Sequence, residues 1–235
     1  MIKFIKKIIL ILFIVLIVVS AFILKKGHDL FEEAIEEISI KDKIVEIKEN
    51  TENYTTYEEL PKDYVNAVVS VEDRRFFYHS GIDLISIGRA IAKDITTLKL
   101  VEGGSTITQQ LAKNTYFSQK KEFTRKIAEI FMANEFEKEC SKEEIFELYV
   151  NTIYFGDGYY SIKDATRGYF DKDPIDMNMF EMTLLAGIPN APSVYSPNSN
   201  PELSKQRHAQ VLSKMIKYGY ITKEEADSIM SEYDK

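Results

Sequence analysis

An uninterrupted apolar run near the N-terminus constrains the fold more than any other feature of this sequence. It extends over residues 8–24, where Ser20 is the only clearly polar side chain. A helix of this length covers about 26 Å, close to the roughly 30 Å of a bilayer's hydrocarbon core. We therefore expect a transmembrane helix over about residues 8–24, within an N-terminal segment comprising residues 1–27.

Charged residues around this run predict its orientation. Residues 1–27 contain five lysines and no acidic residue, whereas residues 28–63 contain twelve acidic and four basic residues. This lysine excess favours a cytoplasmic N-terminus, with the remainder of the chain on the outer face of the membrane. A cleaved signal peptide is the alternative, because residues 19–21 are small enough for cleavage. The apolar run continues to Leu24, which favours an uncleaved anchor.

After the anchor, the sequence predicts a charged stalk over residues 28–57 and a helical body over residues 58–235. The stalk is expected to be helical over residues 29–38. In the body, apolar residues recur at helical spacing, and capping patterns begin at Ser141 and Thr222. No set of strands is apparent. The single cysteine excludes an intramolecular disulfide, and three scattered histidines do not suggest a closed zinc site. The predicted class is mainly α.

An acidic pair, Glu72 and Asp73, lies between the apolar residues 67–69 and the aromatic pair Phe76-Phe77. A carboxylate among apolar neighbours loses hydration, which raises its pKa and suits it to act as a general base near neutral pH. The alternative is an ordinary ion pair with a nearby arginine on a solvated helix face.

A second segment is rich in hydrogen-bonding side chains. It begins with two glycines at 103–104, and its polar residues are Ser105, Thr106, Thr108, Gln109, Gln110 and Asn114. Hydroxyl and amide groups at this density are typical of a site for a polyhydroxylated ligand such as a sugar.

A basic cluster follows, because residues 113–126 contain five basic side chains and one acidic one. Within it Arg125 precedes Glu129 by four residues, so the two share a helix face. This is either a surface ion pair or, together with Lys113, a diphosphate clamp beside a second carboxylate. The charge of residues 64–235 sums to −4, so nothing global indicates nucleic-acid binding.

Five ordered blocks of this sequence resemble the motifs of family 51 glycosyltransferases, the peptidoglycan glycosyltransferases that polymerise lipid II. The blocks are Glu72-Asp73-x-x-Phe76-x-x-His79-x-Gly81, residues 104–114, Arg125-Lys126-x-x-Glu129, residues 147–156, and residues 184–197. The resemblance covers about residues 58–215. Larger members of the family add a transpeptidase domain. Here Ser118-x-x-Lys121 is not followed by a Lys-Thr-Gly string, so the chain resembles the monofunctional type without transpeptidase activity.

The resemblance implies a lysozyme-like helical lobe with a smaller membrane-proximal lobe, on the outer face of a bacterial cell membrane. The substrates would be lipid II and the growing glycan strand, and other cell-wall synthesis proteins would be partners. Glu72 would deprotonate the acceptor 4-hydroxyl, which displaces undecaprenyl diphosphate with inversion. Glu129 would be the second catalytic carboxylate, orienting Arg125, holding a divalent cation (Mg²⁺ or Mn²⁺), or assisting the leaving group.

The same resemblance implies the binding residues. Those expected to hold or order the substrate are Asp73, His79, Ser105, Thr106, Gln109, Gln110, Lys113, Asn114, Arg125, Lys126 and Asn151. Two other functions compete with this one. A muramidase or lytic transglycosylase also needs a buried glutamate, but its substrate has no diphosphate for the basic cluster to bind. A membrane-tethered scaffold would need no catalytic glutamate.

Overall fold

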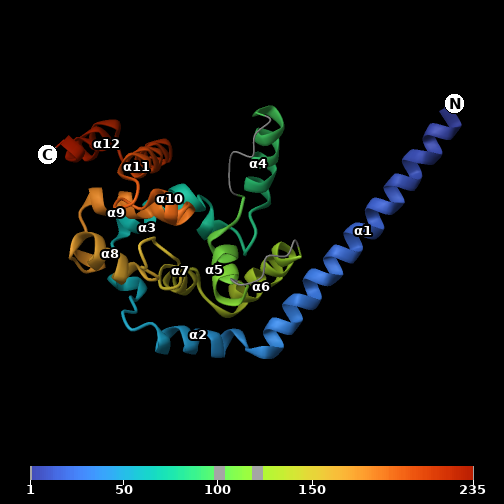
Figure 1. Cartoon of the computed structure of the whole chain (residues 1–235), viewed down its shortest axis with the longest axis horizontal. Helices are drawn as coiled ribbons and strands as arrows, with labels where there is room; N and C mark the ends of the chain where they lie inside the picture. Colours follow the sequence, from blue (N-terminus) through green and yellow to red (C-terminus); the bar gives the residue numbers. More distant parts are fainter. Residues whose placement is uncertain (1, 98–103, 118–123, 235) are drawn as a thin grey trace.

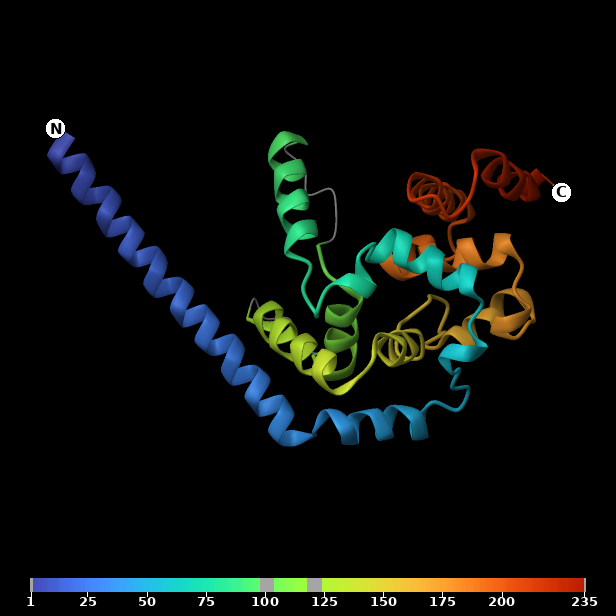
Figure 2. The ribbon, with the colours of Figure 1, turned by 180° about the vertical axis from the view of Figure 1, so that it is seen from behind.

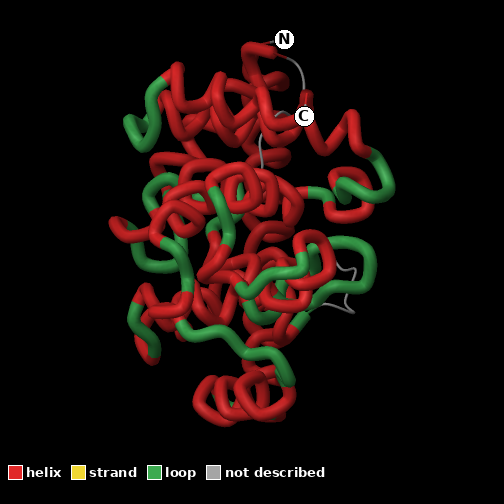
Figure 3. Tube along the Cα trace, turned by 90° about the vertical axis from the view of Figure 1, so that its left-hand side faces the viewer, coloured by secondary structure: helices red, strands yellow, loops and turns green. Residues whose placement is uncertain are grey.

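The computed structural model describes residues 2–97, 104–117 and 124–234, and these contain helices but no strand (Figure 3). The α-helices are α1 (Ile2–Glu37), α2 (Ile40–Asn50), α3 (Lys62–Glu72), α4 (Leu84–Thr97), α5 (Ile107–Tyr116), α6 (Arg125–Glu139), α7 (Lys142–Val150), α8 (Ile162–Phe170), α9 (Met179–Gly187), α10 (Pro192–Tyr195), α11 (Pro201–Lys217) and α12 (Lys223–Met230). Short 3₁₀ turns lie at Tyr57–Glu59, Phe76–Tyr78, Pro174–Asp176, Ile188–Asn190 and Ser231–Asp234. The predicted mainly α class is confirmed.

The N-terminal helix α1 is longer than the sequence analysis predicted. It runs without a break from the apolar segment into residues expected to begin the stalk, and it extends far from the body (Figures 1 and 2). Its apolar part has a mean hydropathy of 3.2 and is not buried against the protein. By length and composition, this helix is a candidate membrane span.

Residues expected to form a charged stalk lie against the body. The C-terminal part of α1 and the following helix α2 both pack on α6. Leu30, Phe31, Ile40 and Ile47 are buried members of the main core. The segment therefore contributes apolar contacts as well as charge; the boundary at residue 58 stays a prediction.

Local capping explains where several helices begin. Asp83 accepts hydrogen bonds from the backbone N–H groups of Ile85 and Ser86, both at 3.0 Å, at the start of α4. The two predicted capping boxes are also present, at Ser141 before α7 and at Thr222 before α12. Such caps satisfy backbone donors that a helix N-terminus otherwise leaves unpaired.

The core joins two groups of helices. In the first, α3 packs on α9 and α11; in the second, α5 packs on α6 and α7. Tyr64 of α3, Leu111 of α5 and Met132 of α6 are fully buried in one continuous apolar cluster. This packing brings the C-terminal end of α3 between α5 and α11, where the candidate site lies.

Candidate active site

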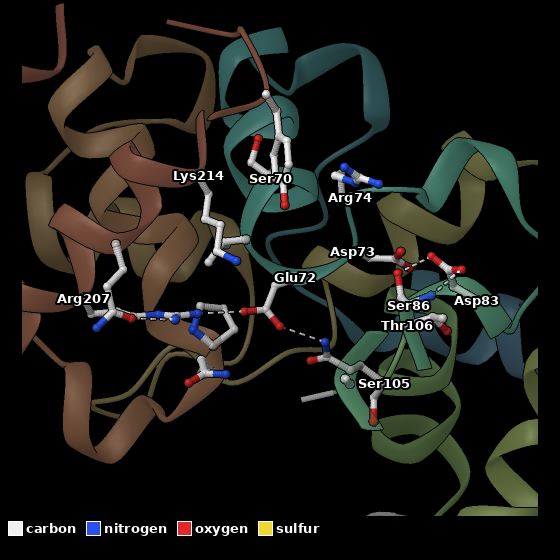
Figure 4. A pocket seen from close by; sticks show the side chains of 18 of the residues that line it. Ser70, Glu72, Asp73, Arg74, Asp83, Ser86, Ser105, Thr106, Arg207 and Lys214 are labelled. Atoms are coloured by element: carbon white, nitrogen blue, oxygen red, sulfur yellow. Dashed lines mark hydrogen bonds and ion pairs between the residues drawn. The ribbon is translucent and has the colours of Figure 1, made fainter. Parts of the chain in front are cut away.

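A cleft of about 910 Å³ lies at the C-terminal end of α3. Its walls come from α3, α4, the loop before α5, α5 and α11, so segments far apart in the sequence meet there (Figure 4). Among the sequence-predicted residues, the cleft is lined by Glu72, Asp73, Ser105, Thr106, Gln110 and Lys113. Its size and its polar lining are suitable for a ligand larger than a single sugar.

Glu72, the last residue of α3, points into the middle of this cleft (Figure 4). Its side chain is only 7% exposed. Gln110 Nε2 donates a hydrogen bond to Glu72 Oε2 at 2.9 Å, and Arg207 Nη2 donates to Oε1 at 3.2 Å. Burial raises the pKa of Glu72; the hydrogen bond from Gln110 and the charge of Arg207 oppose this rise without cancelling it. The sequence prediction of a carboxyl group with a raised pKa is therefore confirmed.

Asp73 has a different environment from its neighbour. Its carboxylate accepts hydrogen bonds from His79 Nε2, at 3.0 and 2.9 Å, and from the backbone N–H of Ile107 at 3.1 Å. Ile107 is the first residue of α5, so Asp73 joins the end of α3 to the start of α5. Asp73 and His79 thus fix the relative positions of Glu72 and Gln110.

Two residues expected to contact sugar have a structural role at the start of α5. Thr106 Oγ1 accepts a hydrogen bond from the backbone N–H of Gln109 and donates one to the carbonyl of Gly81. Gln109 Oε1 in turn accepts from the backbone N–H of Thr106, which completes a capping box. Both residues are buried. They position α5, while Gln110 is the glutamine that reaches the cleft.

The second predicted carboxylate, Glu129 of α6, lies among basic side chains. Lys126 Nζ donates to Glu129 Oε2 at 3.0 Å and to Ser105 Oγ at 2.6 Å. Arg125 Nε lies 3.2 Å from Glu129 Oε1, a close ion pair without the alignment of a hydrogen bond. Glu129 itself is buried. We name Arg125, Lys126 and Glu129 the α6 cluster.

Lys113 stands between Glu72 and the α6 cluster. It lines the cleft from α5 and interacts electrostatically with both Glu129 and Glu72. Burial lowers the pKa of Lys113, while the negative charge of Glu129 opposes this change. The structure therefore brings together the base candidate, a partly buried cation and the α6 cluster, as the sequence spacing predicts.

Among the described residues, those around Glu129 do not form a protein cage for a divalent cation. In the described part of the chain, no three His, Cys, Asp or Glu side chains are close enough to share one. Both carboxylate oxygens of Glu129 already face basic side chains.

Comparisons with known proteins identify the family. A family model described as Transglycosylase matches residues 40–216, most of the chain. The chain belongs to the transglycosylase family. The match begins at α2, inside the segment that the sequence analysis assigned to the stalk.

Curated relatives of this transglycosylase fall into two size classes. A penicillin-binding protein 1F of Bacillus subtilis is 42% identical over 79% of this chain, which spans only 26% of that protein. A putative transglycosylase of Cupriavidus necator is 40% identical over 78% of this chain and 79% of its own length. The transglycosylase thus spans about a quarter of the first relative and most of the second.

A crystal structure of penicillin-binding protein 1A from Haemophilus influenzae was also found. It is 30% identical, covers 54% of this transglycosylase and 15% of its own chain, and has a TM-score of 0.37. Membership of the family rests on the family model and on the Cupriavidus necator relative.

Seven of the predicted site residues lie outside the lining of the cleft: His79, Gln109, Asn114, Arg125, Lys126, Glu129 and Asn151. Asn114 is on α5, one turn beyond Gln110. Asn151 ends α7, where Oδ1 accepts from the backbone N–H of Thr55 at 2.9 Å and Nδ2 donates to the Thr55 carbonyl at 2.7 Å. Asn151 therefore fastens the segment before α3 to α7; a role in ordering the site stays a prediction.

One wall of the cleft was missed by the sequence analysis. Arg207, Gln210, Ser213 and Lys214 of α11 all line it, and Arg207 contacts Glu72 directly. Arg207 Nε also donates to the carbonyl of Gly187 at the end of α9. The available signal was the spacing of Arg207, Gln210 and Lys214, which places polar side chains on one face of a helix that is otherwise partly buried.

Proposed function

We propose that this transglycosylase is a peptidoglycan glycosyltransferase that polymerises lipid II into glycan strands. One observation carries the proposal: a buried carboxylate with a raised pKa, Glu72, shares a cleft with Lys113, which adjoins the α6 cluster. Sugar transfer from a lipid-linked diphosphate needs both a base and cations for the leaving group. A glycan hydrolase would not need the cations, because its substrate has no diphosphate leaving group.

In the proposed reaction, Glu72 accepts the proton of the acceptor's 4-hydroxyl. The resulting oxygen nucleophile attacks the anomeric carbon of the donor strand, and the bond from that carbon to the diphosphate oxygen breaks. Attack from the face opposite the leaving group inverts the anomeric configuration. A carboxylate with a raised pKa is a stronger base than an exposed one, which suits this step. Gln110 and Arg207 hold its two oxygens in place.

The departing undecaprenyl diphosphate carries the negative charge that develops in the transition state. Lys113, which lines the cleft and interacts electrostatically with Glu129, would receive it together with Lys126 and Arg125. Fixed cations in a partly dehydrated site stabilise such charge strongly. We assign Glu129 the role of orienting Arg125 and Lys126, because both are held against its carboxylate.

The membrane is proposed to supply the substrate. The apolar part of α1 would span the bilayer with the N-terminus in the cytoplasm and the body on the outer face. The helix α4 projects from the body toward the same side as the N-terminus of α1 (Figures 1 and 2), and its Leu84 and Ile85 are exposed. We propose that α4 belongs to the membrane-proximal lobe. Other cell-wall synthesis proteins would act on the uncross-linked product.

A polymerisation assay tests the proposal. The full chain, reconstituted in lipid vesicles, is given labelled lipid II with and without Mg²⁺, and the products are separated by length. Wild type should form long strands, whereas Glu72→Gln should be slower by about 10²–10⁴-fold because the amide cannot accept the proton. Helix content of the variant, measured by circular dichroism, should equal that of wild type.

The same assay separates the alternatives. Polymerised glycan given to the wild-type protein should stay intact, whereas a muramidase or lytic transglycosylase would shorten it. Near-wild-type strand synthesis by Glu72→Gln would contradict the assignment of the base. A protein that leaves lipid II unchanged under all conditions would be better explained as a scaffold.

A further inference from the structure

The end of the membrane helix lies directly against the first turn of α6. Gly27 of α1 has no side chain, and a Cβ there would stand 2.5 Å from Ile127 Cγ2 and 3.0 Å from the carbonyl oxygen of Thr124. Both distances are shorter than ordinary van der Waals contact. Only glycine allows the two helices to approach this closely without a shift of one of them.

Aromatic contacts continue this interface on the next turns. The ring centroids of His28 and Phe131 are 5.0 Å apart, and those of Phe31 and Phe131 are 5.7 Å apart. Leu30 and Phe31 are each 8% exposed. In Figures 1 and 2, α6 lies alongside the lower part of α1 in both views. The interface therefore involves several consecutive turns and is apolar, so α1 cannot swing freely relative to α6.

The other side of the same turns of α6 carries the α6 cluster, so the two sides move together as one helix. Ile127, which contacts Gly27, lies between Lys126 and Glu129 in the sequence. Arg125 and Lys126 belong to the same helical turn. Any displacement of α1 along its axis would therefore move the α6 cluster by a similar amount.

The position of this contact along α1 matches the depth of a lipid diphosphate. Gly27 comes three residues after Leu24, the last residue of the apolar run, which is about 4.5 Å along a helix axis. The polar headgroup layer adds roughly 5–7 Å to each side of the hydrocarbon core. Because α1 continues as one helix across this boundary, the contact lies at headgroup height.

We propose that the contact between Gly27 and Ile127 sets the height of the α6 cluster above the membrane, so that its cations meet the diphosphate of a lipid still held in the bilayer. This inference rests on the proposed function. It assigns Gly27 and Ile127 a positioning role, separate from that of the residues that touch substrate.

An insertion in α1 tests this height directly. Seven helix-forming residues placed between Leu24 and Lys25 lift the body by about 10 Å and turn it by only about 20° relative to the span. The contacts that Gly27, His28 and Phe31 make with α6 stay intact, because all three residues follow the insertion point. The matched control carries the same seven residues before Lys3, on the other side of the span.

Two substrates report the result. One is natural lipid II in vesicles of phosphatidylglycerol and phosphatidylethanolamine; the other is a water-soluble lipid II analogue with a short lipid chain. The insertion after Leu24 should reduce the rate on vesicles at least tenfold and change the rate on the soluble analogue less than twofold. The control insertion should leave both rates unchanged. Wild-type activity on vesicles tests the proposed function separately from the inference.

A second variant tests the contact itself. Gly27→Leu forces α1 and α6 apart, so the ratio of the soluble-substrate rate to the vesicle rate should rise several-fold. An insertion variant that works on vesicles as well as wild type would overturn the inference. So would an equal loss on both substrates, since the site would then need the anchor for its own folding and not for its distance from the bilayer. An unchanged ratio in Gly27→Leu would exclude a role for this contact.

Discussion

Arg207 and Glu72 are 135 residues apart in the sequence, yet Arg207 Nη2 lies 3.2 Å from Glu72 Oε1. The pair joins α11 to the end of α3 across the cleft. The cation does not cancel the effect of burial, so the pKa of Glu72 remains raised. Arg207 therefore limits how far the pKa of Glu72 rises, and it fixes the direction of the carboxylate.

Replacement of Arg207 should move the acid limb of the pH–rate profile. In the proposed reaction Glu72 acts as a carboxylate, so the rate should rise with pH through its raised pKa. Arg207→Gln removes a charge that favours the carboxylate, and the acid limb should shift upward by about one pH unit or more. Arg207→Lys keeps the charge and should shift it less. The kcat for lipid II measured between pH 5 and 9 checks this, and identical profiles would contradict the role of Arg207.

Gln109 and Gln110 are adjacent but should respond differently to replacement by alanine. Gln109→Ala breaks the capping box of α5 and should lower the free energy of unfolding by about 1 kcal/mol. Gln110→Ala removes the hydrogen bond to Glu72 and should lower kcat while changing stability less. Thermal unfolding and lipid II turnover, measured on the same detergent-purified proteins, give both quantities. Equal stability loss in the two variants would contradict this division.

Lys113 should affect turnover through its charge. Lys113→Met keeps most of the length of the side chain but removes the cation, and kcat should fall about 10²–10³-fold, as when one stabilising donor is lost from an active site. Lys113→Arg retains the charge and should recover part of the rate. Single-turnover kinetics with lipid II measure the effect on the chemical step. A change in KM alone would indicate that Lys113 only binds the ground state.

His208 predicts an acid sensitivity unrelated to catalysis. It is fully buried on α11, where Nε2 is 2.6 Å from Thr183 Oγ1 and Nδ1 is 3.1 Å from the Tyr233 hydroxyl. Burial lowers the pKa of His208 to about 4 from an ordinary value near 6.5. The neutral form is favoured in the fold, so its stabilising contribution is complete above pH 6.5 and is lost as the pH falls toward 4, by about 3 kcal/mol in all.

The test compares wild type with His208→Gln, which keeps a hydrogen-bonding side chain but does not titrate. Unfolding is followed by circular dichroism at pH values from 4 to 8. The variant should lose less stability than wild type over the acid half of this range. Parallel curves for the two proteins would show that His208 does not titrate on unfolding.

The sequence alone was sufficient to predict features that depend on residues close together along the chain. The caps at Asp83, Ser141 and Thr222 identify helix starts because the donor and acceptor are within four residues of each other. The raised pKa of Glu72 also follows from its local apolar setting. The wall formed by α11 could not be found this way, since the contact of Arg207 with Glu72 requires α3, α9 and α11 to pack first.

Thr106 and Gln109 show that polar composition alone does not predict which side chains contact a ligand. Their hydroxyl and amide groups suggested sugar contacts. Thr-x-x-Gln is also the pattern of a capping box, and in the structure the two side chains form one at the start of α5. The pattern therefore also predicts the capping role from the sequence, while the sugar contacts stay a prediction. Composition alone cannot distinguish polar side chains that bind a ligand from those that satisfy the backbone, because both need the same donors and acceptors.

The end of α3 has a consequence for any attempt to engineer this protein. Glu72 is its last residue and Asp73 its C-cap, so two carboxylates occupy the helix end where partial negative charge favours cations. Since the fold disfavours the ionised form of Glu72, this residue weakens the folded state at neutral pH. Selection for heat resistance alone would therefore favour replacement of Glu72, and under the proposed function such stabilised variants would lose activity.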